Sequence, residues 1–195
     1  MANSSATGGY LAPAVVSPPL QDLDLDLVFQ AYVKGITGLP GALVRPRWQP
    51  TVPQTPEVNV DWCAVGVTPR TRSQDYPAIQ HNPSGDGRDR LTRHQDLEVL
   101  ATFYGPNAMR YADLLRDGAY MPQNGEQISV QGISFVEAGD AIAAPELVNQ
   151  RWLKRYDLPM RFRRVIRRDY AVLNLLGADA AIQSDTGPGA DVVVP

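Results

Sequence analysis

The most strongly charged stretch of the sequence is a row of five arginines within eight residues: Arg161, Arg163, Arg164, Arg167 and Arg168. One interpretation is phosphate contact, because guanidinium groups neutralise backbone phosphates without reading sequence. The other is pairing with carboxylates across strands or between subunits, for which the candidates are Asp96, Glu98, Asp113 and Asp117. The formal net charge is −3, which favours pairing. We therefore predict that most of the row is paired within or between subunits.

Two histidines and several carboxylates in the middle of the chain raise the question of a metal site. His81 and His94 lie near Asp86, Asp89 and Asp96, and imidazole and carboxylate groups are both common metal ligands. Their spacing matches no known ligand pattern, and the stretch has the composition of a polar loop. We therefore expect polar surface residues here, and neither a metal nor another cofactor.

The residue types that serve as nucleophiles lack the surroundings that would activate them. Cys63 lies inside an apolar segment and is expected to pack as a small hydrophobic side chain. Neither Ser73 nor Ser84 lies in a GxSxG motif. Asp96 and Glu98 point to the same side of one expected strand, where solvent or arginine is a commoner partner than a substrate. No catalytic residue is therefore assigned, and the sequence does not indicate an enzyme.

Length, charge and cysteine content restrict the classes of protein further. A chain of 195 residues is most simply one domain, and its single cysteine rules out an internal disulfide and a CxxC metal site. The start of the chain lacks the basic residues and the apolar run of a signal peptide, and no apolar run approaches the ~20 residues of a membrane span. We expect a soluble protein made in a reducing cytoplasm, with no membrane partner.

The unit around which the fold is expected to form is a strand followed by a helix. Between 97 and 103 apolar residues alternate with more polar ones, which is typical of a half-buried antiparallel strand over 91–104. The stop at 105–107, Gly-Pro-Asn, is followed by apolar residues at helical spacing over 108–119. A strand that feeds directly into a packed helix indicates a sheet with a helix laid on it.

The other elements are predicted from the same periodicities. Apolar residues at helical spacing, with aspartates at the start, predict a helix over 22–36, and a shorter one is expected over 122–130. The strand candidates are 43–48, 60–68, 133–137, 157–176 and 178–183. If 60–68 pairs with 91–104, the polar stretch between them becomes a long hairpin arm or loop.

These elements predict an α+β fold with a mixed, mainly antiparallel β-sheet flanked by helices and a long protruding β-hairpin or loop at 69–90. Residues 21–183 form the single domain of this expectation. Residues 1–20 are expected to be a flexible arm rich in Ala, Ser, Gly and Pro. Its apolar residues could dock on a neighbour: Tyr10, Leu11, Val15 and Val16. Residues 184–195 are a low-complexity tail that we expect to be disordered.

A set of short motifs follows in order along most of the chain: DWCAVGVT at 61–68, RHQDLEV at 93–99, FYGPNA at 103–108, LRDG at 115–118, MPQN at 121–124, APELVNQRW at 144–152 and DYAVLNL at 169–175. Together they resemble the neck or tail terminator proteins of long-tailed bacteriophages. The resemblance spans roughly residues 20–182 and leaves out the N-terminal arm and the C-terminal tail.

The resemblance implies a small subunit that closes into a ring, expected to be a hexamer, in the neck or tail of the virion. Such a ring caps the finished tail tube, stops its polymerisation and offers the surface on which the head–tail connector docks. The implied partners are further copies of the chain, the tail tube protein and the connector, with assembly in the host bacterial cytoplasm. Genomic DNA passes through the channel without specific binding. No catalytic residues come with this family.

On this basis, the charged residues of the sheet are candidates for subunit contacts or for the channel wall. They are Arg70, Arg72, Arg88, Arg90, Asp96, Glu98, Arg161, Arg163, Arg164, Arg167 and Arg168. Since DNA must pass through the channel, side chains that face it should not bind phosphate strongly.

Three other functions stay open. A head-side adaptor or head-completion protein belongs to the same structural class, and binding to tail tubes or to heads would separate the two. A metal-dependent hydrolase would use His81, His94 and the carboxylates near them. A nucleic-acid-binding module would use the arginine row, and its affinity for DNA would fall steeply with added salt.

Overall fold

The computed structural model describes residues 3–14, 19–49, 51, 53–73, 76–148, 150–175, 178–184 and 187–194, without the side chains of 69–73, 178–184 and 187–194. The chain forms two compact units. Unit 1 consists of Met1–Ser17, Ala78–Thr92 and Arg167–Pro195, and unit 2 of Pro18–Pro77 and Arg93–Ile166. The expected single domain over 21–183 stays a prediction.

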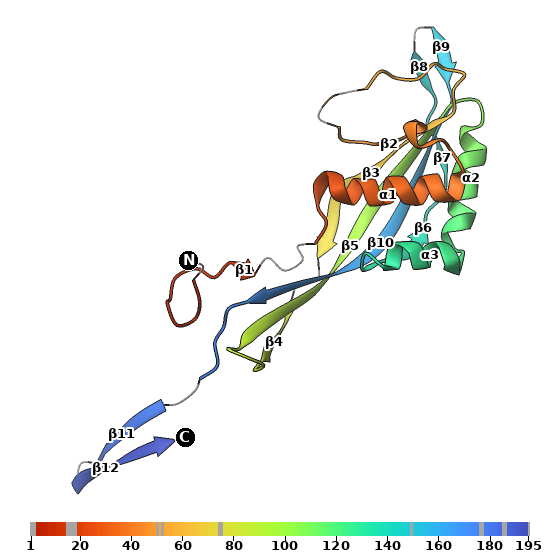
Figure 1. The fold of residues 1–195 in the computed structure, drawn as a ribbon. Coiled ribbons are helices and arrows are strands. Elements are labelled where there is room, and N and C mark those ends of the chain that lie inside the picture. Colours follow the sequence, from red (N-terminus) through yellow and green to blue (C-terminus); the bar gives the residue numbers. More distant parts are fainter. Residues whose placement is uncertain are drawn as a thin grey trace. The chain divides into compact units, whose positions relative to one another are not determined.

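Most strands belong to one eight-stranded sheet with the order β1-β10-β5-β3-β2, to which β4 adds on β5, and β6 and β7 add on β10 (Figure 1). These strands are β1 (Pro13–Ala14), β2 (Val44–Pro46), β3 (Trp62–Ser73), β4 (Ala78–Asn82), β5 (Arg88–Tyr104), β6 (Ile133–Ala138), β7 (Ile142–Ala143) and β10 (Arg155–Tyr170). In unit 2, β3 pairs antiparallel with β5, and β6 and β7 pair antiparallel with β10, whereas β2 runs parallel to β3. The predicted mixed, mainly antiparallel sheet is therefore confirmed.

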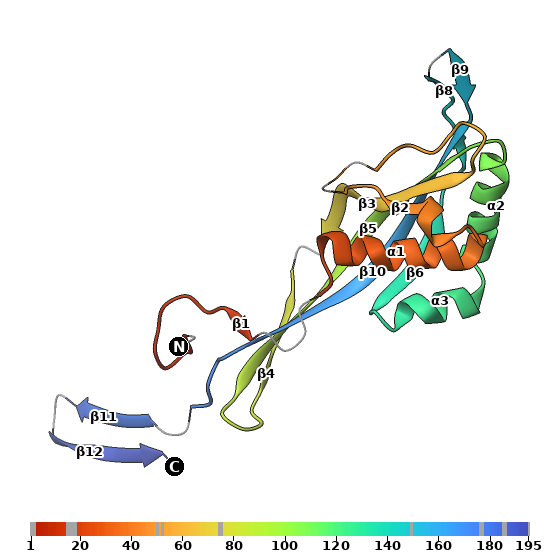
Figure 2. The same cartoon turned by 45° about the horizontal axis from the view of Figure 1, so that its top comes forward.

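In the described part of unit 2, three helices complete the α+β fold: α1 (Asp22–Thr37), α2 (Ala108–Ala119) and α3 (Pro122–Ser129), with a short 3-10 turn, η1 (Gly41–Leu43), before β2. α1 packs along β2 and β3 and also contacts α2 and α3, which in turn contact β6. Figure 2 shows α1 crossing the strands, with α2 and α3 beside it. The helices predicted over 22–36, 108–119 and 122–130 are thus confirmed almost to the residue.

The core of unit 2 lies between these helices and the apolar face of the sheet. The four alternating residues of β5 are all buried, as their spacing predicts: Leu97, Val99, Ala101 and Phe103. Phe162 of β10 packs its ring against Phe29 and Tyr32 of α1, with centroids 4.9 and 5.7 Å apart, and against Phe135 of β6 at 5.5 Å. One aromatic cluster therefore joins α1 to both strands.

The turn from β5 into α2 has a carboxylate partner. Asp61, just before β3, accepts hydrogen bonds from the backbone N–H of Asn107 (2.8 Å) and from its side-chain amide (2.9 Å). A negative charge at a helix N-terminus interacts favourably with N–H groups that have no partner within the helix. Gly105 has a φ of +109°, and a Cβ there would collide with Asp61 and with the Val60 carbonyl oxygen. This close turn therefore requires glycine.

In unit 1, β4 and the first residues of β5 form an antiparallel hairpin, with Ala78 opposite Thr92. The stretch over 69–90 is therefore largely strand, because β3 continues to Ser73 and a short turn connects β4 to β5. β1 pairs with the last two residues of β10, so the described part of the N-terminal arm is attached within this unit.

The structure differs from two expectations near the C-terminal end. The strand expected to continue over 171–176 ends at Tyr170, because Asn174 instead donates its backbone N–H to the turn between β4 and β5. Where a disordered tail was expected over 184–195, the structure has an antiparallel hairpin of β11 (Ala178–Ser184) and β12 (Gly187–Val194), separate from the main sheet. The β-branched residues at 192–194 favour this extended backbone.

Candidate functional site

The arginine row lies along β10, where neighbouring side chains alternate between two faces. On the more exposed face of unit 2, Arg161 forms an ion pair with Glu137 of β6 (3.2 Å), directly opposite it in the ladder. Arg163 donates two hydrogen bonds to Asp96 of β5, at 2.7 and 3.3 Å, and these raise the pKa of Arg163. Both arginines therefore have carboxylate partners within the subunit.

Arg164 points to the opposite face and is buried, with 6% of its surface exposed. Its Nε donates to Oε1 of Gln95 (2.8 Å), and a terminal nitrogen donates to the Leu20 carbonyl oxygen (2.5 Å). Burial, together with the nearby charge of Arg93, lowers the pKa of Arg164 below its usual value. This guanidinium holds β10, β5 and the residues before α1 together, which is a role inside the subunit.

The remaining arginine candidates have different surroundings. In unit 1, Arg90 donates two hydrogen bonds to Asp169, at 2.8 and 2.9 Å, which lower the pKa of Asp169. The nearby charge of Arg88 acts in the same direction. The side chains of Arg167 and Arg168 have no hydrogen bond or ion pair among the residues that the structure describes. The side chains of Arg70 and Arg72 lie outside the described residues.

Of the carboxylate candidates, some pair with the arginine row and others do not. Asp96 pairs with Arg163, as described, whereas the side chain of Glu98 is exposed and its backbone carbonyl accepts a hydrogen bond from Thr68. Asp113 and Asp117 of α2 form no ion pair with the arginine row within the described ranges. The carboxylate partners found for the row, those of Arg161 and Arg163, thus lie on adjacent strands rather than on the helix.

His81 belongs to a hydrogen-bonded cluster in unit 1. Its Nδ1 lies 2.7 Å from Oδ1 of Asp89, and its Nε2 lies 2.9 Å from Oδ1 of Asn174. Asn174 also donates hydrogen bonds to three carbonyl oxygens of the 83–86 turn. The cluster therefore attaches the segment after β10 to the β4–β5 turn. Sequence reasoning missed Asn174, because nothing near position 174 signals a contact with a turn so far away in the chain.

The structure does not assemble the metal or nucleophile sites that the residue types suggested. Among the residues that it describes, no group of three His, Cys, Asp or Glu side chains could hold a metal ion. Cys63 is fully buried in β3, and burial raises the pKa of its thiol far above the usual value. A thiol in this environment is a packing residue, since only the thiolate is a nucleophile.

One uncovered apolar surface in the described part of unit 2 is a small hairpin of β8 (Glu146–Val148) and β9 (Arg151–Leu153), which forms a two-stranded sheet of its own. Leu147 and Trp152 lie opposite each other in its register and are 62% and 68% exposed. In Figure 1 the hairpin lies beyond the ends of β3 and β5, above the start of α2. Large apolar side chains gathered on one exposed element mark an interaction surface.

The base of this hairpin is fixed by Arg155, which was not singled out from the sequence. It pairs with Glu146 of β8 and with Asp157 of β10, the latter at 2.8 Å. Its guanidinium also lies 5.9 Å from the centroid of the Tyr104 ring, which stacks on Trp62 at 4.2 Å. The signal in the sequence is the spacing of Arg155 and Asp157, which places both on one face of a strand.

These features are those of a structural subunit: an α+β core, ion pairs that join neighbouring strands, and an anchored hairpin with exposed apolar side chains. The family model of phage neck terminator proteins matches residues 23–187, and the chain belongs to this family. No curated protein matches the sequence.

Membership of this family makes the protein a structural component of the phage neck or tail, located in the virion, rather than a member of a known enzyme class. The resemblance drawn from the sequence motifs is thereby confirmed. In the described part of the chain, no helix combines the length and the apolar character that crossing a membrane requires.

Proposed function

We propose that copies of this protein form a closed homo-oligomeric ring, a hexamer, on the end of the finished tail tube. The ring stops the polymerisation of tail tube protein and presents its other face to the head–tail connector. Assembly takes place in the host cytoplasm, and genomic DNA later passes through the channel without specific binding. The function is then carried by shape and surface rather than by a reaction.

The observation that carries this proposal is the β8–β9 hairpin. A single copy leaves Leu147 and Trp152 more than half exposed, while Arg155 holds the base of the hairpin in place. Aromatic and aliphatic side chains on a fixed, exposed element are common anchors of protein interfaces. A contact in which this hairpin packs on a different surface of the next copy generates a ring when the rotation closes.

Two strands of unit 2 supply further surfaces for such a contact. Within the described ranges, β6 pairs with β10 alone and β2 with β3 alone. Each therefore has one side of its backbone without a strand partner, and such edges can pair with another chain. Two different edges on one subunit suit a head-to-tail contact, whereas in a two-fold dimer one patch meets itself.

The charge pattern of the sheet supports the free passage of DNA. Arg161, Arg163 and Arg90 each hold a carboxylate within their own subunit. A guanidinium that is already paired must give up its carboxylate, or share it, before it can bind a phosphate. The pairs therefore lower the affinity of this surface for DNA.

The proposal is tested with a phage whose gene for this protein carries a nonsense mutation, grown with and without the protein supplied from a plasmid. Without the protein we expect tail tubes of uncontrolled length and heads that lack tails in electron micrographs. Supplying the wild-type protein should restore tails of uniform length that are joined to heads. Tails of normal length on normal heads in its absence would overturn the proposal.

The hairpin itself is tested with the double variant Leu147→Ser and Trp152→Ser. We expect this variant to keep its circular dichroism spectrum but to form no rings in mass photometry and to fail in complementation. Val130→Ser is the control, because Val130 is also exposed and apolar but lies at the end of α3. Rings and full complementation by the hairpin variant would assign the ring contact to another surface.

A binding experiment separates the terminator from a head-side adaptor. The purified protein is mixed with isolated tail tubes and, in parallel, with tail-less heads, and both mixtures are sedimented and imaged. Binding to the ends of tail tubes is expected. Binding to heads alone would make the protein an adaptor or head-completion protein instead.

A further inference from the structure

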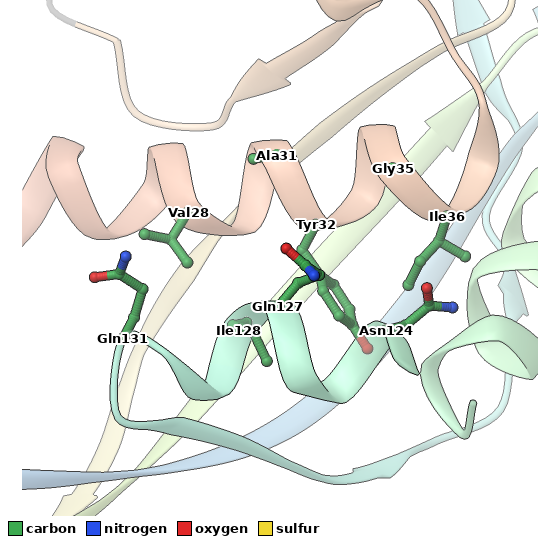
Figure 3. A pocket seen from close by; sticks show the side chains of 9 residues that line it. All are labelled: Val28, Ala31, Tyr32, Gly35, Ile36, Asn124, Gln127, Ile128 and Gln131. Carbon is green, nitrogen blue, oxygen red and sulfur yellow. The ribbon is translucent and has the colours of Figure 1, made fainter. Parts of the chain in front are cut away.

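A groove of about 410 Å³ runs between α1 and α3 of unit 2 (Figure 3). Its apolar part is formed by Val28 and Ile36 of α1 and by Ile128 of α3. Gly35 also lines it, and a side chain at this position would enter open space. None of the residues that line the groove is charged.

Amide side chains stand along the α3 side of the groove. Asn124 already donates a hydrogen bond to the Gly118 carbonyl oxygen (2.8 Å). Gln127 and Gln131 are exposed, and their side-chain amides have no hydrogen bond among the residues that the structure describes; Figure 3 shows both on the groove. Each amide offers two donors and one acceptor oxygen, which are the groups that an extended polypeptide backbone requires.

Tyr32 gives the groove an unsatisfied polar group. This residue lines the groove and is only 7% exposed, and in the described part its hydroxyl has no hydrogen-bond partner. Burial raises the pKa of Tyr32 to about 12. A buried hydroxyl without a partner is unfavourable, and it lies beneath the wall of the groove rather than on its open surface.

The lining of the groove selects an uncharged and extended occupant, because a charged group would lose its hydration here without gaining a partner. Residues 1–21 of the chain contain no Asp, Glu, Lys or Arg. The other terminal segment is less suitable, since β11 and β12 contain Asp179 and Asp191. The charge pattern therefore points to the N-terminal segment.

The conformation of the N-terminal segment agrees with this assignment. The backbone N–H of Ser5 donates a hydrogen bond to Ala171, the residue after β10, and Pro13–Ala14 pairs with the end of β10. Tyr10 lies between these two attachments, with 98% of its surface exposed. Such an aromatic side chain is held out to solvent by a segment whose two sides are fixed, and Leu11 follows it directly.

We propose that the α1–α3 groove of one copy binds the N-terminal segment of a second copy. Tyr10 and Leu11 occupy the apolar part of the groove, and the backbone beside them bonds to the side-chain amides of Gln127 and Gln131. This inference rests on the proposed ring, because it requires a neighbouring copy. It adds an arm exchanged between subunits to the contact made by the β8–β9 hairpin.

Crosslinking between two differently substituted full-length proteins tests the exchange. Ala12→Cys places a thiol beside Tyr10 and Leu11, and Gln127→Cys places one on the groove. The natural Cys63 is buried and does not compete for a short bismaleimide. Mixing the two proteins should give a crosslinked heterodimer, at several-fold higher yield than mixing Ala12→Cys with the exposed control Val130→Cys.

A blocking variant tests the groove without unfolding the protein. Gly35→Leu fills the groove, and because leucine favours a helix more than glycine does, the variant should melt no earlier than the parent. It should abolish the crosslink between Ala12→Cys and Gln127→Cys. Gly125→Leu is the matched control, since Gly125 also faces open space on α3 but does not line the groove, and it should leave the crosslink intact.

The oligomeric state of the same samples separates this inference from the proposed ring. Rings that form normally but show no crosslink above the control, or a crosslink that survives Gly35→Leu, would overturn the exchange and leave the ring intact. Crosslinks found only when both cysteines are on one chain would overturn it in the same way. A protein that stays monomeric even with tail tubes would overturn both proposals.

Discussion

At the scale of single residues, His81 has surroundings that change with pH. The side-chain nitrogen of Asn174 donates to the carbonyl oxygens of Pro83 and Gly85, at 3.0 Å each, so its Oδ1 faces His81 and can only accept. Asp89 is the acceptor on the other side of the ring. A neutral imidazole has one N–H and satisfies one of these acceptors, whereas the imidazolium satisfies both.

We predict that the attachment between His81 and Asn174 weakens as the pH rises. Hydrogen bonds to Asp89 and Asn174 raise the pKa of His81 in the folded protein. Its stabilising contribution is therefore complete below about 6.5, the pKa of an unperturbed histidine, and is lost as the pH rises through the folded value. In an NMR titration, His81 should show an elevated pKa, and the side-chain amide signals of Asn174 should change with the same midpoint.

The variant His81→Gln is the control for this titration. Glutamine keeps a polar side chain at the position but has no group that titrates in this range, so the Asn174 signals should become independent of pH. Asn174 signals that follow the same titration in the variant would show that a group other than His81 controls the attachment.

Asp26 of α1 is a buried carboxylate, and here the charged form is the one that its surroundings disfavour. Burial raises its pKa and Asp22 adds to the effect, although the backbone N–H of Val67 donates a hydrogen bond to it at 2.9 Å. We predict that Asp26→Asn raises the free energy of unfolding at pH 7 by up to about 1 kcal/mol, because the amide is neutral and can still accept from Val67.

The pH dependence of this gain follows from the sign of the pKa shift. A carboxyl whose pKa is raised by folding destabilises the protein above its folded pKa and ceases to do so as the pH falls and it takes up a proton. The gain of Asp26→Asn should therefore shrink towards about pH 4, near the usual pKa of an aspartate. Urea denaturation at both pH values measures it, and a variant that is less stable at pH 7 would refute the prediction.

For single residues, the sequence shows which side chains are polar but not which of them are in contact. The alternation along β10 correctly separates Arg161 and Arg163 from the buried face that carries Arg164. It did not indicate Glu137, which pairs with Arg161 because β6 adds to β10 in one particular register. Register depends on the whole sheet and its connections, and local periodicity does not contain it.

Among the elements, the contact between α1 and α2 depends on a glycine. A Cβ at Gly118 would lie 2.3 Å from Cγ2 of Ile36, so the two helices approach too closely for any side chain. We predict that Gly118→Ala lowers the free energy of unfolding by about 1–3 kcal/mol, because overpacking outweighs the better helix propensity of alanine. Gly125→Ala on α3, which enters open space, should be neutral or stabilising by up to about 1 kcal/mol.

A double-mutant cycle identifies the cause of the Gly118→Ala effect. Ile36→Ala removes the methyl group that the new Cβ would meet, so Gly118→Ala should cost clearly less in that background. Equal costs in both backgrounds, measured by chemical denaturation, would place the strain elsewhere in α2.

Helices and strands were predictable where turn-forming residues stand at the point at which the spacing of apolar residues changes from that of a strand to that of a helix. The sequence Gly105–Asn107 separates an alternating segment from a helical one, and the structure changes from β5 to α2 at that point. The segment 171–175 has a strand-like composition, yet Asn174 binds a turn that is distant in the sequence. Its conformation is therefore set by a tertiary contact, which overrides local propensity.

For the whole molecule, the sequence shows apolar residues in the β8–β9 segment but not that they stay uncovered. From their residue types, Leu147 and Trp152 could equally well be predicted to lie in the core, since most large apolar side chains are buried. Their exposure follows from the separation of this hairpin from the main sheet. Surfaces that serve assembly are thus the part of the structure that composition and periodicity predict least.

The charge pairs of the sheet lead to a prediction about DNA at the scale of the whole molecule. With a net charge of −3 and with Arg161 and Arg163 held by carboxylates, the protein should bind duplex DNA too weakly to measure near physiological salt. The double variant Asp96→Asn and Glu137→Gln frees both guanidinium groups. It should bind DNA at low salt, with a log–log salt slope steeper by about 1–2 than that of the wild type, since each freed group can neutralise one phosphate.

Fluorescence anisotropy with a labelled duplex over a series of salt concentrations measures these slopes. The double variant Asp113→Asn and Asp117→Asn is the matched control, because it changes the net charge equally on α2, where the described structure shows no ion pair with the arginine row. If the control gained as much affinity, net charge rather than the release of arginines would explain the effect. Tight, steeply salt-dependent binding by the wild type would mean that this surface holds DNA, and that the arginine row does more than join the strands of the sheet.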